Sequence, residues 1–171
     1  AAGDHVDEAE SSIRTIKERI RSIKAGLLFR LTVRRIIELV KFVVGRVNTC
    51  ISQYSHDGLC PRVRLTGVLL DYNKEFRAGF GFLVIARNKN VVSNDPLAVR
   101  CEVCICLNPT HNRQGSWRMQ KLTNGKIVSR TQFKIIPMTD LAQARLNELA
   151  TLEDNGHPIC LEDEYEYDEP E

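Results

Sequence analysis

The stretch SWRMQKLTNGKIVSRTQF, residues 116–133, decides the fold class. Two short runs of strand-forming residues, 116–122 and 126–133, flank the dipeptide Asn124-Gly125. This dipeptide favours the tight turn of a two-stranded hairpin, because Asn and Gly tolerate the positive φ angles that such a turn needs. The stretch therefore predicts an antiparallel pair of strands.

Further short strand-like runs lie on both sides of this hairpin. Residues 81–87, 97–107 and 134–137 are rich in Val, Ile, Leu and Cys, and turn-forming segments separate them. Four or five short strands in about 60 residues favour a small barrel or a curled sheet. We expect it to occupy residues 80–137.

Helical patterns flank the β region. Residues 7–24 predict one helix, and a second should run from Thr32, as N-cap, to about Gln53. The third, residues 138–153, has Thr139 or Asp140 as its cap. Its apolar side is predicted to hold Leu141, Ala144, Leu149 and Leu152. The second helix should be buried or covered by a partner over more than half its circumference, through Ile36, Ile37, Val40, Val43, Val44, Val47 and Ile51.

These patterns predict an α+β chain in five parts. Residues 1–54 hold two helices, 55–79 form a linker broken by Gly and Pro, 80–137 form the barrel, 138–153 form a helix, and 154–171 form a disordered acidic tail. We expect no membrane span, since no run approaches about 18 uncharged apolar residues. Nothing reads as a secretory signal. The missing initiator Met suggests a piece of a longer chain.

Charge is distributed unevenly along the chain. Residues 1–60 hold 10 Lys and Arg against 7 Asp and Glu, residues 61–137 hold 13 against 4, and residues 138–171 hold 1 against 11. The net charges of these parts are therefore +3, +9 and −10. The basic middle part is what a polyanionic partner requires.

The cysteines leave two interpretations open. Cys101 and Cys104 have the C-x2-C spacing of zinc sites, and His111 follows nearby. In a strand, however, Cys101 and Cys104 point to opposite faces. Buried, reduced thiols of an intracellular protein are the favoured interpretation.

One row of polar residues on the first predicted helix also has two interpretations. Glu10, Arg14, Lys17 and Arg21 follow one another at helical spacing, beside a stripe of isoleucines that anchors the helix. The row is either an ordinary solvent-exposed face or a functional surface. If it is functional, the Glu10 carboxylate binds a divalent metal ion and the Arg and Lys side chains contact phosphates.

Three motifs within residues 5–137 carry a resemblance to the integrase region of copia-type retrotransposon polyproteins. AESSIRTI (9–16) resembles the A-E-R-x-N-R-T-L segment with the last acidic residue of the integrase core. DGLCPRVRLTG (57–67) resembles the G-x-S-P-x-E-x-x-x-G loop, and LTNGKIVSRTQF (122–133) is similar to N-P-x-T-G-K-V-I-x-S-R-D-V-x-F. Ser11, Ile13, Cys60 and Val63 depart from these patterns, whereas Ala9, Glu10, Arg14, Thr15, Gly58, Pro61, Gly67, Gly125, Lys126, Ser129, Arg130 and Phe133 match them.

The resemblance implies that residues 1–54 are the last helices of an RNase H-like core and that residues 80–137 form an SH3-like barrel that binds nucleic acid. Glu10 would be the third metal-binding carboxylate, catalytic together with two aspartates upstream of residue 1 and with Mg²⁺ or Mn²⁺. A lone Glu cannot assemble a two-metal site, so this chain alone is expected to be inactive and to bind no metal tightly.

The resemblance implies an activity, the joining of the ends of the element DNA to target DNA. The partners would be DNA and other integrase subunits, with no membrane and no small-molecule substrate, in the cell interior and in the nucleus for integration. Trp117 is either a stacking platform or, as we favour, a core anchor. The cations expected to contact nucleic acid are Arg14, Lys17 and Arg21 on the helix and Arg87, Lys89, Arg113, Arg118, Lys121, Lys126 and Arg130 on the barrel.

A different class of function remains open. The helix pair and barrel could be a non-catalytic module, derived from a decayed or repurposed element, that binds protein or nucleic acid. In that case the acidic tail would mask the basic surface. A small enzyme in its own right is disfavoured, because the four His residues are scattered along the chain without a catalytic pattern.

Overall fold

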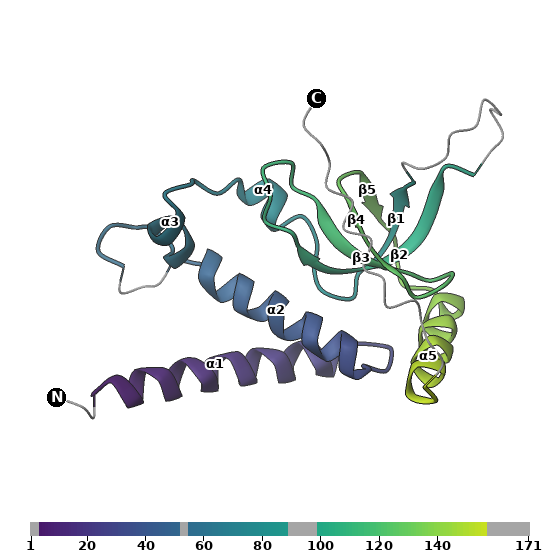
Figure 1. Ribbon diagram of the computed structural model, residues 1–171, viewed down its shortest axis with the longest axis horizontal. Helices are drawn as coiled ribbons and strands as arrows, with labels where there is room; N and C mark the ends of the chain where they lie inside the picture. Colours follow the sequence, from purple (N-terminus) through teal and green to yellow (C-terminus); the bar gives the residue numbers. More distant parts are fainter. Residues whose placement is uncertain (1–3, 52–54, 89–98, 157–171) are drawn as a thin grey trace.

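The computed structural model describes residues 4–51, 55–88 and 99–156 of an α+β protein (Figure 1). A helix pair lies along one side of a single curved sheet, and a C-terminal helix crosses the end at which the pair is joined. The helices are α1 (Asp4–Gly26), α2 (Val33–Thr49), α3 (Pro61–Thr66), α4 (Tyr72–Glu75) and α5 (Asp140–Asp154), and the strands are β1 (Leu83–Arg87), β2 (Cys101–Pro109), β3 (Trp117–Lys121), β4 (Ile127–Arg130) and β5 (Phe133–Ile135).

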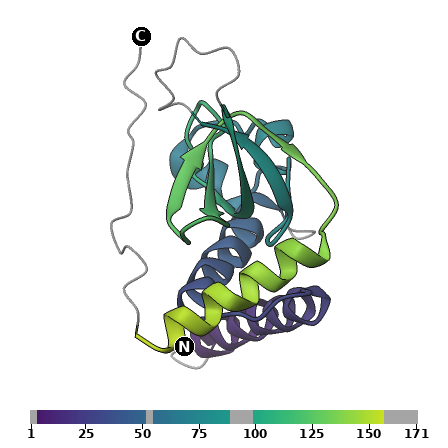
Figure 2. The same cartoon turned by 90° about the vertical axis from the view of Figure 1, so that its right-hand side faces the viewer.

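The sheet is antiparallel throughout, with the strand order β4-β3-β2-β1-β5. The predicted hairpin is confirmed: β3 pairs with β4 across a turn in which Gly125 has φ 72° and Asn124 Oδ1 accepts from the Lys126 amide. The last strand returns to the first, with Val84 opposite Ile135. A register shift between Cys106 and Asn108 marks a bulge, which bends β2 and helps to curl the sheet (Figure 2).

Both faces of β3 and of the second half of β2 are covered. Gln120 on β3 belongs to the face that meets α2, where its Oε1 accepts from Arg35. Trp117 and Met119 belong to the opposite face, inside the curve of the sheet, and are fully buried. Because each face has its own cover, polar as well as apolar residues of β3 lie in the interior.

The helix α2 begins as predicted, with the Thr32 hydroxyl accepting from the Arg35 amide at 3.4 Å. It ends at Thr49, earlier than predicted, and residues 52–54 lie outside the described part. Of the predicted apolar face, Val43 is buried, whereas Ile36, Ile37, Val40 and Ile51 are exposed within this chain, so for them only cover by a partner stays open. The buried side consists of Arg35, Glu38, Leu39, Phe42, Val43 and Thr49.

Polar pairs with the sheet explain this orientation of α2. Arg35 donates from Nε to Gln120 at 2.9 Å and from Nη1 to the carbonyls of Arg30 and Leu146 at 2.8 and 3.0 Å. Glu38 accepts a short hydrogen bond from Asn108 Nδ2. Burial lowers the pKa of Arg35 to about 10, and the charge of Glu153 acts in the opposite direction. Arg35 therefore joins α2, β3 and α5 at one buried point.

The remaining segments depart from the prediction in detail. The predicted linker 55–79 holds two short helices, α3 and α4. The helix α5 is capped by Thr139, as expected, and Leu149 of the predicted apolar side is buried, whereas Leu141 and Ala144 are exposed. The buried side consists of Ala142, Leu146, Leu149 and Ala150. The predicted tail lies outside the described residues from 157 onwards.

The helix α1 packs on the rest of the molecule by one edge. Ile16, Ile20 and Ile23 lie against the core, whereas Ile13 is 50% exposed. The N-terminal half of α1 extends beyond α2 (Figure 1). No helix among the described residues is long and apolar enough to cross a membrane.

Candidate nucleic-acid interface

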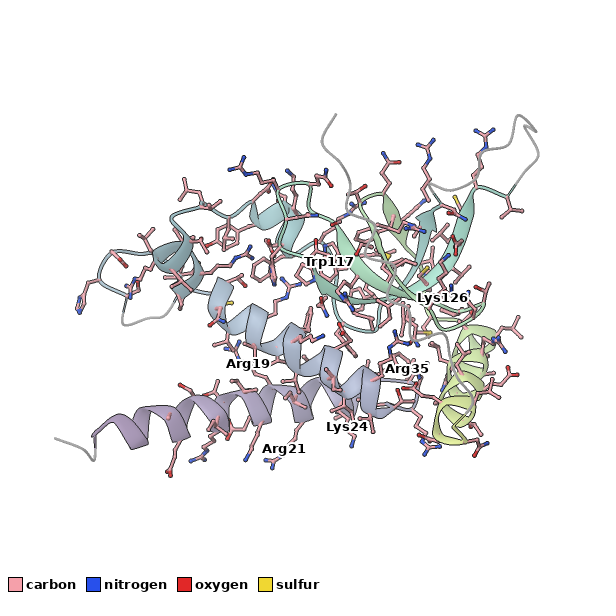
Figure 3. All side chains as sticks on the ribbon, in the orientation of Figure 1. Arg19, Arg21, Lys24, Arg35, Trp117 and Lys126 are labelled. Atoms are coloured by element: carbon pink, nitrogen blue, oxygen red, sulfur yellow. The ribbon has the colours of Figure 1, made fainter. Side chains whose placement is uncertain are left out.

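The polar row predicted on α1 lies at the surface. Glu10, Arg14, Lys17 and Arg21 are all exposed, and Arg14 Nε lies 3.0 Å from Glu18 Oε1. Arg21 and Lys24 project from the same side of α1, and Arg19 projects from the opposite side (Figure 3). Lys24 thus extends the row, which sequence analysis had ended at Arg21 although Lys24 has the required i+3 spacing. The α1 cation row is Arg14, Lys17, Arg21 and Lys24.

Three members of the α1 cation row have no carboxylate partner within the described part of the chain. They are Lys17, Arg21 and Lys24. Over the ten residues from Arg14 to Lys24 the row is about 15 Å long, at 1.5 Å per residue. Exposed cations on a rigid rod can approach several phosphates without first breaking internal ion pairs.

Three of the predicted barrel cations are instead directed into the fold. Arg118 Nε lies 3.4 Å from Glu38 Oε2, and its side chain is only 15% exposed. Lys121 Nζ lies 2.8 Å from Glu102 Oε2. Arg130 is 3% exposed and its Nη2 lies 3.9 Å from Glu102 Oε1. The placement of these three at a nucleic-acid surface is therefore corrected: they neutralise internal carboxylates.

The other barrel cations are more accessible. Arg87 is exposed and donates to Gln132 Oε1 at 3.2 Å. Arg113 is exposed in the β2–β3 connection. Lys126 is half-buried beside the hairpin turn (Figure 3). Lys89 lies outside the described residues. Arg87 and Arg113 remain candidates for contact with phosphates.

Trp117 is a core anchor, as favoured from the sequence. Its side chain is fully buried, and Nε1 donates to the Lys74 carbonyl at 3.1 Å. The ring meets Phe133 edge-on with centroids 6.2 Å apart. An indole enclosed in this way is not accessible for stacking on a base.

A second charged cluster, which sequence analysis missed, fastens α3 and α4 to the β2–β3 connection. Glu75 Oε1 lies 3.2 Å from Arg62 Nη1, and Oε2 lies 2.7 Å from His111 Nδ1. Burial alone would raise the pKa of Glu75, but the hydrogen bond with His111 and the charges of His111 and Arg62 outweigh it and lower this pKa. The three residues are distant in sequence, so no local motif indicated the cluster.

The described residues do not form a metal site on their own. No group of three His, Cys, Asp or Glu side chains among them could hold a metal ion. Glu10 is one exposed carboxylate, whereas Mg²⁺ prefers six oxygen ligands in near-octahedral geometry. Cys101 is exposed and Cys104 is buried, and burial raises the pKa of the Cys104 and Cys106 thiols to about 12.

Comparison with known proteins does not identify a family. No family model matches the chain, and neither the curated proteins nor the solved structures give a significant match.

Proposed function

We propose that this protein binds nucleic acid through the α1 cation row, as the distal part of a retrotransposon integrase. The observation that carries the proposal is the row itself, with three cations that have no carboxylate partner among the described residues. Binding would be mainly independent of sequence, because a row of Arg and Lys contacts phosphates rather than base edges. The partners are DNA and other integrase subunits, and integration takes place in the nucleus.

The strand order supports the barrel in this proposal. An antiparallel meander whose fifth strand returns to pair with the first is the arrangement expected of an SH3-like barrel. The internal pairs of Arg118 and Lys121 move the proposed binding surface away from β3. The contacts with phosphates are assigned to α1, with Arg87 and Arg113 as additional sites.

The exposed apolar side of the helix pair supports the integrase part. Val33, Ile36, Ile37 and Val40 form a stripe at helical spacing on α2, and they are 72%, 41%, 50% and 38% exposed. Adjacent exposed apolar residues of this kind typically mark a surface that packs against another part of a protein, here the rest of a catalytic core. Glu10 would then supply one carboxylate to a metal-binding set whose two aspartates belong to the rest of that core. Mg²⁺ or Mn²⁺ would supply the Lewis acidity for phosphoryl transfer.

A titration with matched double variants tests the binding surface. Lys17→Gln/Arg21→Gln removes two row cations, and Arg19→Gln/Arg64→Gln removes two exposed cations elsewhere. Both variants change the net charge equally, so a general charge effect cancels. Binding to a short mixed-sequence duplex is measured by fluorescence anisotropy over a range of salt concentrations.

The row variant should bind roughly tenfold or more weakly at low salt, and the slope of log K against log salt should become shallower by about 2, near 0.9 per lost phosphate contact. The Arg19/Arg64 variant should stay within about twofold of the unaltered chain. Absence of DNA binding by the unaltered chain at low salt would reject the proposed function. Equal losses in the two variants would reject the α1 cation row as the surface.

A protein-interaction module is the second candidate, and an apolar pocket of about 520 Å³ favours it. The pocket lies between the end of α1, the segment before β1 and the connection from β5 to α5. An apolar groove of this kind can accept the apolar side chains of a protein segment. The same titration separates the two functions, because a chain without affinity for DNA leaves this pocket as the better candidate.

A further inference from the structure

The C-terminal segment is the acidic counterpart of α1. Residues 161–171, LEDEYEYDEPE, contain seven Asp and Glu and no Lys or Arg. The α1 cation row consists of exposed cations, and only Arg14 has a carboxylate partner among the described residues. The two segments therefore have complementary charge.

The chain reaches this acidic segment from a point close to α1. At the end of α5, Asp154 Oδ2 lies 2.6 Å from Arg30 Nη2, and the Arg30 amide donates to Asn147 Oδ1 at 2.9 Å. Arg30 follows Lys24 by only six residues, and α1 ends at Gly26 between them. The described chain ends at Gly156, two residues beyond Asp154.

The length of chain beyond Gly156 is sufficient to reach the whole row. The 15 residues 157–171 span at most about 50 Å when extended, at 3.3–3.6 Å per residue. The α1 cation row is about 15 Å long. The acidic residues can therefore lie along all four cations while the segment stays attached to α5.

We propose that the acidic segment 161–171 binds the α1 cation row of the same molecule and competes there with DNA. The inference rests on the proposed function for its competition step, although the contact itself does not require DNA. A tethered segment has a high effective concentration at its site, so even weak ion pairs compete with an external polyanion. The acidic segment would thereby restrict binding to DNA that offers several phosphates at once.

The contact is tested on the full-length chain. A neutral-tail variant carries Gln for Glu and Asn for Asp at the seven acidic positions of 161–171. A labelled peptide of residues 157–171 is titrated into this variant at low salt and followed by fluorescence anisotropy. The titration is repeated with Lys17→Gln/Arg21→Gln and with Arg19→Gln/Arg64→Gln added to the neutral-tail chain.

The peptide should bind the neutral-tail chain, bind about tenfold more weakly when the two row cations are removed, and bind within about twofold of that chain after the Arg19/Arg64 change. No binding of the peptide, or equal weakening by both pairs of substitutions, would overturn the proposed contact. Light scattering at low salt should show the same oligomeric state for the unaltered chain and the neutral-tail variant. Dimers that disappear in the neutral-tail variant would overturn the contact within one molecule in favour of one between two copies.

The competition step is tested by titration with a duplex. The neutral-tail variant should bind DNA about tenfold more tightly than the unaltered chain at low salt, and this gap should close at high salt, where both contacts are screened. Equal DNA affinities of the two chains would overturn the competition. If the peptide binds α1 but neither chain binds DNA, the proposed function fails and the contact between the acidic segment and α1 stands.

Discussion

Two helices of this protein carry similar charged residues with opposite consequences. On α2, Arg35 and Glu38 are 1% and 3% exposed and are hydrogen-bonded to the sheet and to α5. On α1, Lys17 and Arg21 are exposed and have no carboxylate partner in the described part of the chain. The charges of α2 orient the helix on its neighbours, whereas those of α1 remain available to a partner.

The largest expected effect follows from replacing Arg35. Arg35→Met keeps much of the side-chain volume but leaves Gln120 Oε1 and the carbonyls of Arg30 and Leu146 without their donors. Each buried acceptor that is left without a hydrogen bond typically costs about 1–3 kcal/mol. We expect a loss of about 3 kcal/mol or more in the free energy of unfolding, measured by urea denaturation.

Arg35→Lys sharpens this experiment, because Lys keeps the charge without the planar fork that reaches three acceptors. The unfolding free energy of Arg35→Lys should lie between those of Arg35→Met and the unaltered chain. Arg21→Met is the matched control on α1 and should leave the unfolding free energy nearly unchanged. A loss below about 1 kcal/mol in Arg35→Met would break the contrast between the two helices.

This contrast marks the limit of what the sequence predicts. The Asn124-Gly125 turn and the Thr32 and Thr139 caps were predicted correctly because each depends on residues within a few positions of one another. Helical spacing alone does not distinguish a buried charged side from an exposed one. The buried side of α2 depends on β3: Arg35 and Gln120, which are hydrogen-bonded between the two elements, are 85 residues apart along the chain.

The candidate interface was predictable to a similar extent. The exposure of Arg14, Lys17 and Arg21 agrees with their helical spacing, which needs no distant partner. Arg118 and Lys121 are paired with Glu38 and Glu102, and these pairs exist only once α2 and β2 are placed beside β3. Trp117 and Met119 alternate with Arg118 and Gln120, a pattern typical of a strand with one side facing solvent, whereas in the structure α2 covers that polar side.

An intermediate effect is expected at Glu75, whose partners lie on α3 and on the β2–β3 connection. Glu75→Gln keeps the shape but loses the charge that faces Arg62 and His111, at a cost of about 1–3 kcal/mol near neutral pH. Because the folded-state pKa of Glu75 is lowered from 4.5, its contribution is present above about pH 4.5 and is lost as the pH falls through the lower folded value.

The stability difference between Glu75→Gln and the unaltered chain should therefore narrow on acidification. Urea denaturation at a series of pH values from neutral to acidic measures it. Glu10→Gln, which alters an exposed carboxylate on α1, is the matched control for the loss of one negative charge. A constant difference for Glu75→Gln at all pH values would mean that the charge of Glu75 does not contribute to the fold.

The smallest effect is expected on α1 itself. Lys17→Ala and Arg21→Ala should each change the unfolding free energy by less than about 0.5 kcal/mol, because neither cation has a carboxylate partner in the described part of the chain and Ala is a slightly better helix former. Arg14→Ala removes the exposed pair with Glu18, at a cost of about 0.3–0.5 kcal/mol. Urea denaturation of the three variants measures whether the row contributes to the stability of the fold. A loss above about 1 kcal/mol in either Lys17→Ala or Arg21→Ala would place that residue with Arg35, as a structural charge, and would remove it from the proposed DNA-binding surface.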